Sequence, residues 1–255
     1  MFDKNKNNES YKDPITFGIR PVIEAINSGK EIDKILIQNG LKGELIRDLM
    51  PLIKENKINF QFVPVQKLNS LTRGNHQGVV AYISEIPFQN IEYILPGTFE
   101  QGKMPLILIL DRITDVRNFG AIARTAECSG VDAIIIPFKG AAQVNGIAVK
   151  TSAGALMRIP VCKSHNLKNT IEFLKESGLQ IISCTEKTDN LIYNADLNKP
   201  TALIMGSEED GISEEYMKRS DMLVKIPVIG AIESLNVSVA CGVILYEAVR
   251  QRTNL

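Results

Sequence analysis

The sequence predicts an α/β protein of two compact units, a small alternating α/β domain followed by a larger domain built on a parallel sheet. Aliphatic runs without internal polar residues recur through the second part of the chain. Such runs are typical of strands buried on both faces of a parallel sheet. A length of 255 residues suits one small and one medium domain.

The first unit is expected over residues 14–86. Apolar residues at helical spacing predict helices within 17–28 and over 44–55. Three short strands are expected at 34–37, 60–63 and 78–84. Residues 1–13 are polar and rich in Asn and Lys, so we expect a disordered tail there and no signal peptide or membrane anchor.

Residues 87–103 lose periodicity and carry two prolines and two glycines, a composition typical of a linker. The second unit is expected over 104–255. Its strands are expected at 106–110, 133–136, 159–161, 179–184, 202–205 and 223–226. Each is followed by a helix or a Gly-containing loop, which predicts a doubly wound parallel sheet.

Charge and cysteine content exclude several classes of function. Lys plus Arg equals Asp plus Glu at 29 each, which excludes a protein that coats nucleic acid by bulk positive charge. With no CxxC pair and only two histidines, we expect no metal site. We expect reduced, buried cysteines at Cys128, Cys162, Cys184 and Cys241. The longest aliphatic stretch is far shorter than the roughly 20 residues of a membrane span, so a cytoplasmic protein is expected.

Glycines and small residues gather in three segments near the ends of predicted strands, where open α/β sheets bind ligands. In the first segment, 118–126, Asn118 is expected to cap a helix. Arg124 lies nearly two turns further on the same broad face. An arginine there can clamp a phosphate or stabilise an oxyanion, and the alternative is a solvated helix charge.

The second segment, 204–213, leaves its strand at Gly206, which allows a ligand to approach the backbone closely. Three acids follow, Glu208, Glu209 and Asp210. They disfavour a nucleotide polyphosphate and suit hydroxyl or ammonium groups. The alternative is an acidic surface turn before a helix capped at Ser213.

The third segment, 226–238, couples a buried strand to a helix that is expected to open near Ser234. Ile226, Ile229 and Leu235 are expected to line a pocket for an uncharged aromatic base, with a capped core helix as the alternative. No strand is followed by GxGxxG, which disfavours a dinucleotide-dependent oxidoreductase.

In their order and spacing these three segments resemble the three motifs of the SpoU (TrmH-like) RNA ribose methyltransferases of the SPOUT superfamily. The first unit, which ends in His76-Gln77-Gly78, resembles the family's small L30e-like substrate-binding domain. The two-domain layout is most similar to the bacterial 23S rRNA guanosine 2′-O-methyltransferases. The tRNA-modifying relatives are similar enough that a tRNA target stays open.

The resemblance implies transfer of a methyl group from S-adenosylmethionine to a ribose 2′-hydroxyl, with no metal. It also implies a homodimer and a carboxyl-terminal trefoil knot. The residues it assigns to catalysis are Asn118, Arg124, Glu208, Ser234 and Asn236. Those it assigns to the cofactor are Gly206, Ile226 and Leu235. Because a guanidinium stays protonated, we expect Arg124 to stabilise the developing alkoxide and to orient a phosphate.

RNA contacts are expected from a polar loop of the first unit and from the first motif. The residues are Arg73, Asn75, His76, Gln77 and Arg117. For the loop, the alternative is a turn with a solvent-exposed histidine. For the whole chain, the alternative is a non-catalytic RNA-binding protein, which the presence of the catalytic motif residues disfavours.

Overall fold

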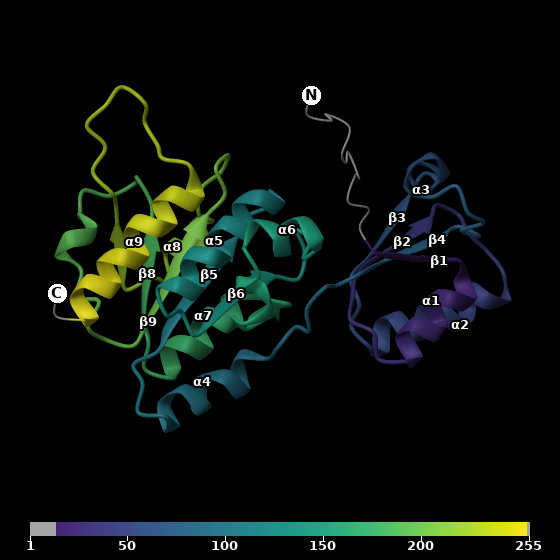
Figure 1. Cartoon of the computed structure of the whole chain (residues 1–255), viewed down its shortest axis with the longest axis horizontal. Coiled ribbons are helices and arrows are strands. Elements are labelled where there is room, and N and C mark those ends of the chain that lie inside the picture. The colour runs from purple at the N-terminus through teal and green to yellow at the C-terminus, as the bar shows by residue number, and fades with distance from the viewer. Residues whose placement is uncertain (1–13, 254–255) are drawn as a thin grey trace, which may run out of the picture. The chain divides into compact units, whose positions relative to one another are not determined.

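The computed structural model describes residues 14–253, and the chain divides into two compact units with the main boundary between Glu85 and Ile86 (Figure 1). Each unit has its own sheet and its own hydrophobic core, as expected of a domain. The tail expected over residues 1–13 lies outside the described residues.

The first unit is a four-stranded sheet of order β1-β4-β2-β3 with helices on both faces. Its strands are β1 (Ile15–Phe17), β2 (Ile32–Gln38), β3 (Phe60–Val63) and β4 (Val79–Ile83). Its helices are α1 (Ile19–Asn27), α2 (Glu44–Glu55) and α3 (Val65–Leu71). β2 and β3 are parallel, whereas β4 is antiparallel to β1 and to β2.

Alternate residues of β2 face two cores. Ile35 and Ile37 pack with α1 and α2, whereas Leu36 packs with Leu68 of α3 on the opposite face. Sequence patterns did not predict β1 or α3. β1 has three residues and α3 follows Pro64 with seven, so both are too short to show a clear period.

The second unit contains the parallel sheet that the sequence predicts. Its strand order is β10-β8-β9-β5-β6-β7, and every neighbouring pair is parallel. The strands are β5 (Leu106–Asp111), β6 (Ala133–Pro137), β7 (Val161–Ser164), β8 (Gln180–Cys184), β9 (Thr201–Gly206) and β10 (Met222–Val224). β7 begins two residues later than predicted, because Ile159 is buried in the turn that precedes the strand.

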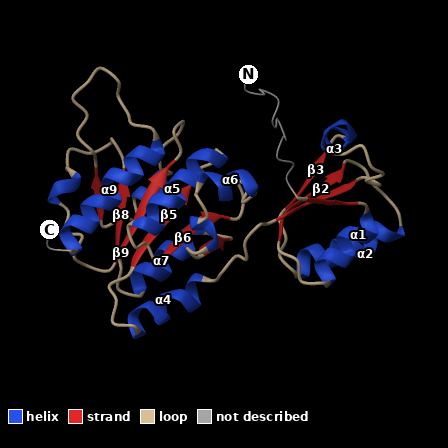
Figure 2. Cartoon of the chain, in the orientation of Figure 1, coloured by secondary structure: helices blue, strands red, loops and turns tan. Residues whose placement is uncertain are grey.

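Helices cover both faces of this sheet (Figure 2). They are α4 (Ile91–Glu100), α5 (Val116–Cys128), α6 (Gly146–Thr151), α7 (Leu167–Glu176), α8 (Glu214–Met217) and α9 (Val237–Arg252). Two 3₁₀ turns, η1 (Ala155–Met157) and η2 (Ile192–Asn194), complete the unit. Leu106, Leu108 and Leu110 of β5 pack with α5 and α9. Ile107 and Ile109 pack with α4 and α7 on the other face.

The strand order reverses between β5 and β9. β6 and β7 extend the sheet from β5 in one direction, and β9, β8 and β10 extend it in the other. At such a switch point the connecting loops leave in opposite directions and open a crevice beyond the carboxyl ends of the strands. Asp111 at the end of β5 pairs in register with Gly206 at the end of β9, so these two residues mark the crevice.

The segment expected to be a linker, residues 87–103, contains helix α4, so the expectation of an irregular segment is wrong. Asn90 caps the helix by accepting a hydrogen bond from the amide of Glu92 at 3.0 Å. Ile91 and Leu95 are buried in the core of the second unit. Burial of these side chains outweighs the low helix propensity of the proline and glycine inside the helix.

The four cysteines are free thiols. Cys162 and Cys241 are buried as expected, and Cys184 is partly buried, but Cys128 is exposed. Within residues 14–253 no helix is long and apolar enough to cross a membrane. The same residues contain no group of three or more His, Cys, Asp or Glu that could hold a metal ion.

Leu95→Ala should lower the free energy of unfolding by about 2–5 kcal/mol, the usual loss when a core leucine is truncated. Leu95 is 1% exposed, whereas Tyr93 on the same helix is 81% exposed. Tyr93→Ala is therefore the matched control and should change stability by less than about 0.5 kcal/mol. Urea denaturation followed by circular dichroism measures both, and equal stabilities would contradict the packing of α4 on the sheet.

Candidate active site

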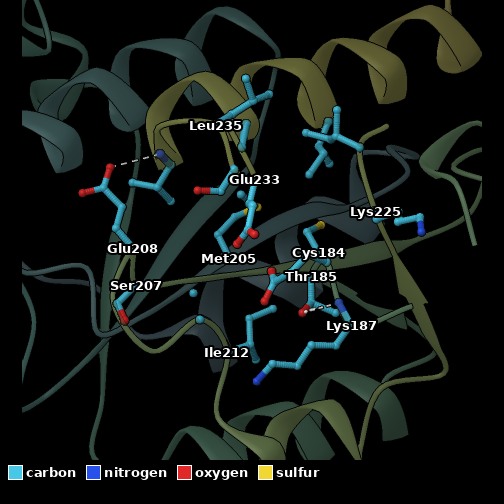
Figure 3. Close-up of a pocket in the computed structure, with 18 of the residues that line it drawn as sticks. Cys184, Thr185, Lys187, Met205, Ser207, Glu208, Ile212, Lys225, Glu233 and Leu235 are labelled. Carbon is cyan, nitrogen blue, oxygen red and sulfur yellow. Dashed lines mark hydrogen bonds between the residues drawn. The ribbon is translucent and has the colours of Figure 1, made fainter. Parts of the chain in front are cut away.

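A cavity of about 380 Å³ lies at the carboxyl end of the parallel sheet, on the β9 side of the switch point. Loops after β8, β9 and β10 and the start of α9 form its walls. Figure 3 shows Glu233 and Leu235 on one side of it and Thr185, Lys187 and Ile212 on the other. Its volume falls within the range of small-molecule sites, about 300–1,000 Å³.

Gly206 is required by the turn that forms one wall. A Cβ atom on Gly206 would lie 2.2 Å from the carbonyl carbon of Gly211 and 2.3 Å from the amide nitrogen of Ile212. The chain turns back here, with the amide of Gly211 donating to the carbonyl of Ser207 at 3.0 Å. Only a residue without a side chain allows this approach, which places backbone in the cavity wall.

The buried carboxylate of Asp111 holds this turn against the end of β5. Asp111 Oδ2 accepts hydrogen bonds from the amide and the hydroxyl of Ser213 at 2.8 and 2.7 Å. Asp111 is 2% exposed, so these partners stabilise a charge that would be unfavourable to bury alone. Ser213 occupies the cap position of α8, but its hydroxyl bonds Asp111 and does not make the helix cap that the alternative interpretation of this segment required.

Arg112 holds the far end of the same turn. Its guanidinium donates to Asp210 Oδ2 at 2.8 Å and to the carbonyl of Gly211 at 3.1 Å. The hydrogen bond to Asp111 raises the pKa of Arg112 above its usual value, although burial acts in the opposite direction. The backbone of Arg112 has a φ of 58°, a conformation that costs a non-glycine residue about 1–3 kcal/mol. The bonds to the turn offset this strain.

The side chains of Asn118, Glu208 and Asn236 meet beside the cavity and form what we call the amide–carboxylate cluster. Asn236 Nδ2 donates to Glu208 Oε1 at 2.6 Å and to Asn118 Oδ1 at 3.1 Å. Asn118 Nδ2 donates to Glu208 Oε1 at 3.3 Å. Glu208 also accepts from the amide of Val237 at 3.3 Å (Figure 3). One residue from each sequence motif therefore contributes to a single group of hydrogen bonds.

Two helices begin at residues other than those expected. Asp115 and not Asn118 caps α5, by accepting from the amide of Asn118 at 2.7 Å. Asn118 therefore lies in the first turn, which leaves its side chain available to the amide–carboxylate cluster. α9 begins at Val237 and not near Ser234, and Asn236 is its cap.

The three residues expected to contact the cofactor, Gly206, Ile226 and Leu235, all line the 380 Å³ cavity, and Ser234 lines it too. Ile229 does not, so the expectation for this residue is wrong. It is 98% exposed because the loop between β10 and α9 projects away from the sheet (Figure 1).

Sequence patterns did not predict that Thr185, Lys187 and Glu233 line this cavity. A signal was present for Thr185 and Lys187, because the aliphatic strand 179–184 is followed by polar residues, as is the strand before segment 204–213. Cys184 also lines the cavity. Burial, and to a lesser degree the neighbouring thiol of Cys241, raise the pKa of Cys184 well above its usual value.

A second cavity of about 360 Å³ lies at the ends of β9 and β5 and shares part of its wall with the first. Glu208 lines both cavities, whereas Asn118 and Asp115 line only the second. Four of the eleven lining residues carry carboxylates and one, Arg112, carries a positive charge, so a neutral hydroxyl-bearing group is a better occupant than a phosphate.

Arg124 is exposed on α5 and lines neither cavity. With the part of the chain that the structure describes it makes no hydrogen bond or ion pair. The structure therefore does not bring it into contact with Asn118. The next residue, Thr125, lies against α9, since a Cβ on Gly242 would be 3.7 Å from Thr125 Cγ2. Arg117 is exposed on the same helix.

His76, expected to contact RNA or solvent, is 9% exposed and is bonded inside the first unit. Its Nδ1 accepts from the amide of Gly78 at 2.9 Å. Its Nε2 therefore carries the proton and donates to Asn69 Oδ1 at 2.8 Å. Both ring nitrogens hold the loop together, which corrects the expectation of an available histidine.

Gln77 also has an internal role, because its Oε1 accepts from the amide of Ile19 at the start of α1 at 3.2 Å. Arg73 and Asn75 are exposed on the same loop. Of the loop residues expected to contact RNA, these two have the side chains best placed to do so.

A cavity at the switch point of a parallel sheet, walled by three loops, is typical of ligand-binding α/β domains. The sequence model of the SpoU rRNA methylase family matches residues 105–246. A second model, described as RNA 2′-O ribose methyltransferase substrate binding, matches residues 15–89. The chain belongs to the SpoU rRNA methylase family and is an RNA methyltransferase.

Similar proteins cover nearly the whole chain. A TrmH family tRNA/rRNA methyltransferase of Staphylococcus saprophyticus is 37% identical over 238 residues, 93% of this chain and 96% of that protein. The SpoU methyltransferase AviRb from Streptomyces viridochromogenes, crystallised with AdoMet, has a TM-score of 0.61 at 24% identity and covers 99% of this chain and 96% of its own. The A. aeolicus TrmH/SpoU tRNA modifying enzyme has a TM-score of 0.55 at 32% identity over 60% of this chain and 77% of its own.

Gly206→Ala should distort the wall of the cavity, because the added methyl group meets backbone atoms that cannot rotate away. We expect a loss of about 1–3 kcal/mol in stability, as for other overpacked sites, and faster amide hydrogen exchange over residues 206–212. Gly230→Ala is the control, since a Cβ there has no atom within 4 Å. Equal stability and equal amide hydrogen exchange in Gly206→Ala and Gly230→Ala would contradict the close backbone approach at Gly206.

Proposed function

We propose that this enzyme transfers a methyl group from S-adenosylmethionine to a ribose 2′-hydroxyl of structured RNA. The observation that carries the proposal is that Glu208 lines two adjoining cavities and joins the amide–carboxylate cluster between them. The first cavity suits the cofactor and the second suits the ribose. The transferred methyl group would then move between two neighbouring spaces in one crevice.

The residues of the first cavity fit the cofactor. Ile226 and Leu235 give an apolar surface for an uncharged base, and the backbone at Gly206 allows close approach. Glu208 and Glu233 bring negative charge, which favours the ammonium and sulfonium groups of S-adenosylmethionine over a polyphosphate. When bound, the cofactor supplies an electrophilic methyl group on a positively charged sulfur. AviRb, the fold neighbour crystallised with AdoMet, supports this assignment.

The second cavity gives the acceptor ribose its position. We propose that Asn118, Glu208 and Asn236 hold the sugar through hydrogen bonds, and that Ser234 shapes the neighbouring wall. Arg124 is proposed to stabilise the alkoxide that develops as the hydroxyl loses its proton, and to orient an adjoining phosphate. Because Arg124 lines neither cavity, this role requires that bound RNA extends over the exposed side of α5 or that Arg124 of a second subunit reaches the ribose.

We propose a guanosine of 23S rRNA as the first candidate target and a tRNA ribose as the second. The first unit, proposed to have an L30e-like fold, would present Arg73 and Asn75 to the RNA. We further propose that the enzyme acts in the cytoplasm without a metal ion and that its carboxyl-terminal segment forms a trefoil knot. Mapping of 2′-O-methyl marks in a strain that lacks the gene decides the target. A lost tRNA mark would replace the first candidate with the second.

The outward face of α9 supports a homodimer. Val239 and Tyr246 are 52% and 53% exposed and, with the partly buried Val243 between them, form an apolar stripe at helical spacing. Val239→Glu with Tyr246→Glu should convert a particle of two 28.2 kDa chains into a monomer in light scattering. Tyr193→Glu, at 53% exposure outside this stripe, is the control and should leave the dimer intact. An active monomeric wild type would contradict the proposal.

Arg124→Ala should reduce the single-turnover rate of methylation by roughly 10²–10⁴, the usual contribution of a group that handles the proton or its charge. Its affinity for S-adenosylmethionine should stay within about threefold, because the residue acts on the transition state. Arg124→Lys should recover little, since lysine lacks the planar fork.

The control for this series is Arg158→Ala. Arg158 is also exposed, and its ion pair with Glu127 is long, at 4.0 Å. We expect near-normal rates for it. Calorimetry measures the cofactor affinity of each variant, and near-normal methylation by Arg124→Ala would return that residue to the alternative of a solvated charge.

A further inference from the structure

A third cavity, of about 500 Å³, lies at the ends of β6 and β7, beside the start of α7. Phe138 and Lys139 line it from the end of β6, His165 from the end of β7, and Tyr216 from α8. None of these residues has a part in the methyl transfer proposed above.

Two aromatic rings in contact, Phe138 and His165, form one surface of this cavity. The ring centroids of Phe138 and His165 are 4.1 Å apart, with 35° between the ring planes. Phe138 is partly buried, whereas His165 is exposed, so the outer ring offers a flat surface backed by the inner one. Lys139 is exposed beside them and brings positive charge. A flat aromatic surface next to a cation matches a nucleotide, which has a base and a phosphate.

The three cavities form a row along the carboxyl edge of the sheet. The first is walled by the β10, β8 and β9 ends, the second by the β9 and β5 ends, and the third by the β6 and β7 ends. This sequence of cavities follows the strand order β10-β8-β9-β5-β6-β7. Neighbouring strands are about 4.8 Å apart, so the second and third cavities are only one or two strand spacings apart.

Consecutive residues line the second and third cavities, because Gly140 lines the second and Lys139 lines the third. The second cavity is lined by Val237 of α9 and the third by Leu167 of α7, which pack on opposite faces of the sheet. A single RNA strand that crosses the carboxyl edge of the sheet from one face to the other would reach both. Proteins that bind single-stranded RNA without sequence preference hold the strand by stacking its bases on aromatic side chains.

We propose that the third cavity binds the base of a nucleotide that flanks the methylated one, stacked on His165, with the phosphate next to Lys139. The inference rests on the proposed function and adds a second nucleotide to the substrate that the enzyme recognises. A phosphate alone would not use the paired rings, which is why we assign a base to the cavity.

The test compares two fluorescein-labelled oligomers of nine nucleotides, a single-stranded RNA and an abasic strand with the same phosphates. Fluorescence anisotropy measures the affinity of the full-length protein for each. His165→Ala should weaken binding of the base-bearing RNA by roughly tenfold and leave the abasic strand unchanged, since one stacking contact is lost. Lys139→Ala should weaken both strands by a similar factor.

The matched control for His165→Ala is Tyr93→Ala, which removes an exposed aromatic ring on α4. The matched control for Lys139→Ala is Lys103→Ala, which removes an exposed lysine just before β5, at the amino-terminal ends of the strands. Both should bind the two oligomers like the wild type. Phe138→Leu should mimic His165→Ala, and if this partly buried substitution unfolds the protein, the exposed His165 decides alone. A wild-type preference for bases that survives in His165→Ala overturns the proposal.

Two further measurements separate this proposal from the proposed function. Calorimetry with S-adenosylmethionine should give the same affinity for the wild type and His165→Ala. On an unmethylated RNA that the wild type methylates, His165→Ala should raise the KM for RNA and leave kcat unchanged. A wild type that discriminates between the oligomers through His165 but binds no S-adenosylmethionine would overturn the proposed function and leave the nucleotide cavity standing.

Discussion

The buried carboxylate of Asp111 is the constraint on which the candidate site depends. It sits at the end of β5, where the strand order reverses, and it takes both hydrogen bonds that Ser213 can donate. Arg112 extends the same attachment to Asp210. The turn between β9 and α8 is therefore fixed at both ends, and a turn fixed in this way can present backbone to a ligand without first being ordered by it.

Glu208 links that turn by hydrogen bonds to the starts of α5 and α9. Its carboxylate receives the side chains of Asn118 and Asn236 and the first amide of α9. A shift of the turn would thus move the start of α5 and α9 relative to each other. Since α9 also carries the apolar stripe of Val239 and Tyr246, the wall of the first cavity and this exposed stripe depend on the same local geometry.

The sheet and the three motif segments were predictable because their signals are local. Aliphatic runs located β5 and β9 to within a residue, and glycine at the end of β9 marked a cavity wall. The role of Asp111 was not predictable in this way, because Ser213 lies 102 residues away. Helix α4 was hidden for a different reason. Its proline and glycine indicate a break, and only the core that receives Leu95 explains why the helix forms.

The thiol of Cys184 has a consequence for chemical selectivity. A methyl donor bound in the first cavity would lie against this sulfur, and sulfur is intrinsically a better nucleophile than a ribose oxygen. The reactive form of cysteine is the thiolate, and burial raises the pKa of Cys184, so the already small thiolate fraction at neutral pH becomes smaller still. The burial that surrounds this sulfur therefore lowers its reactivity toward any electrophile that enters the cavity.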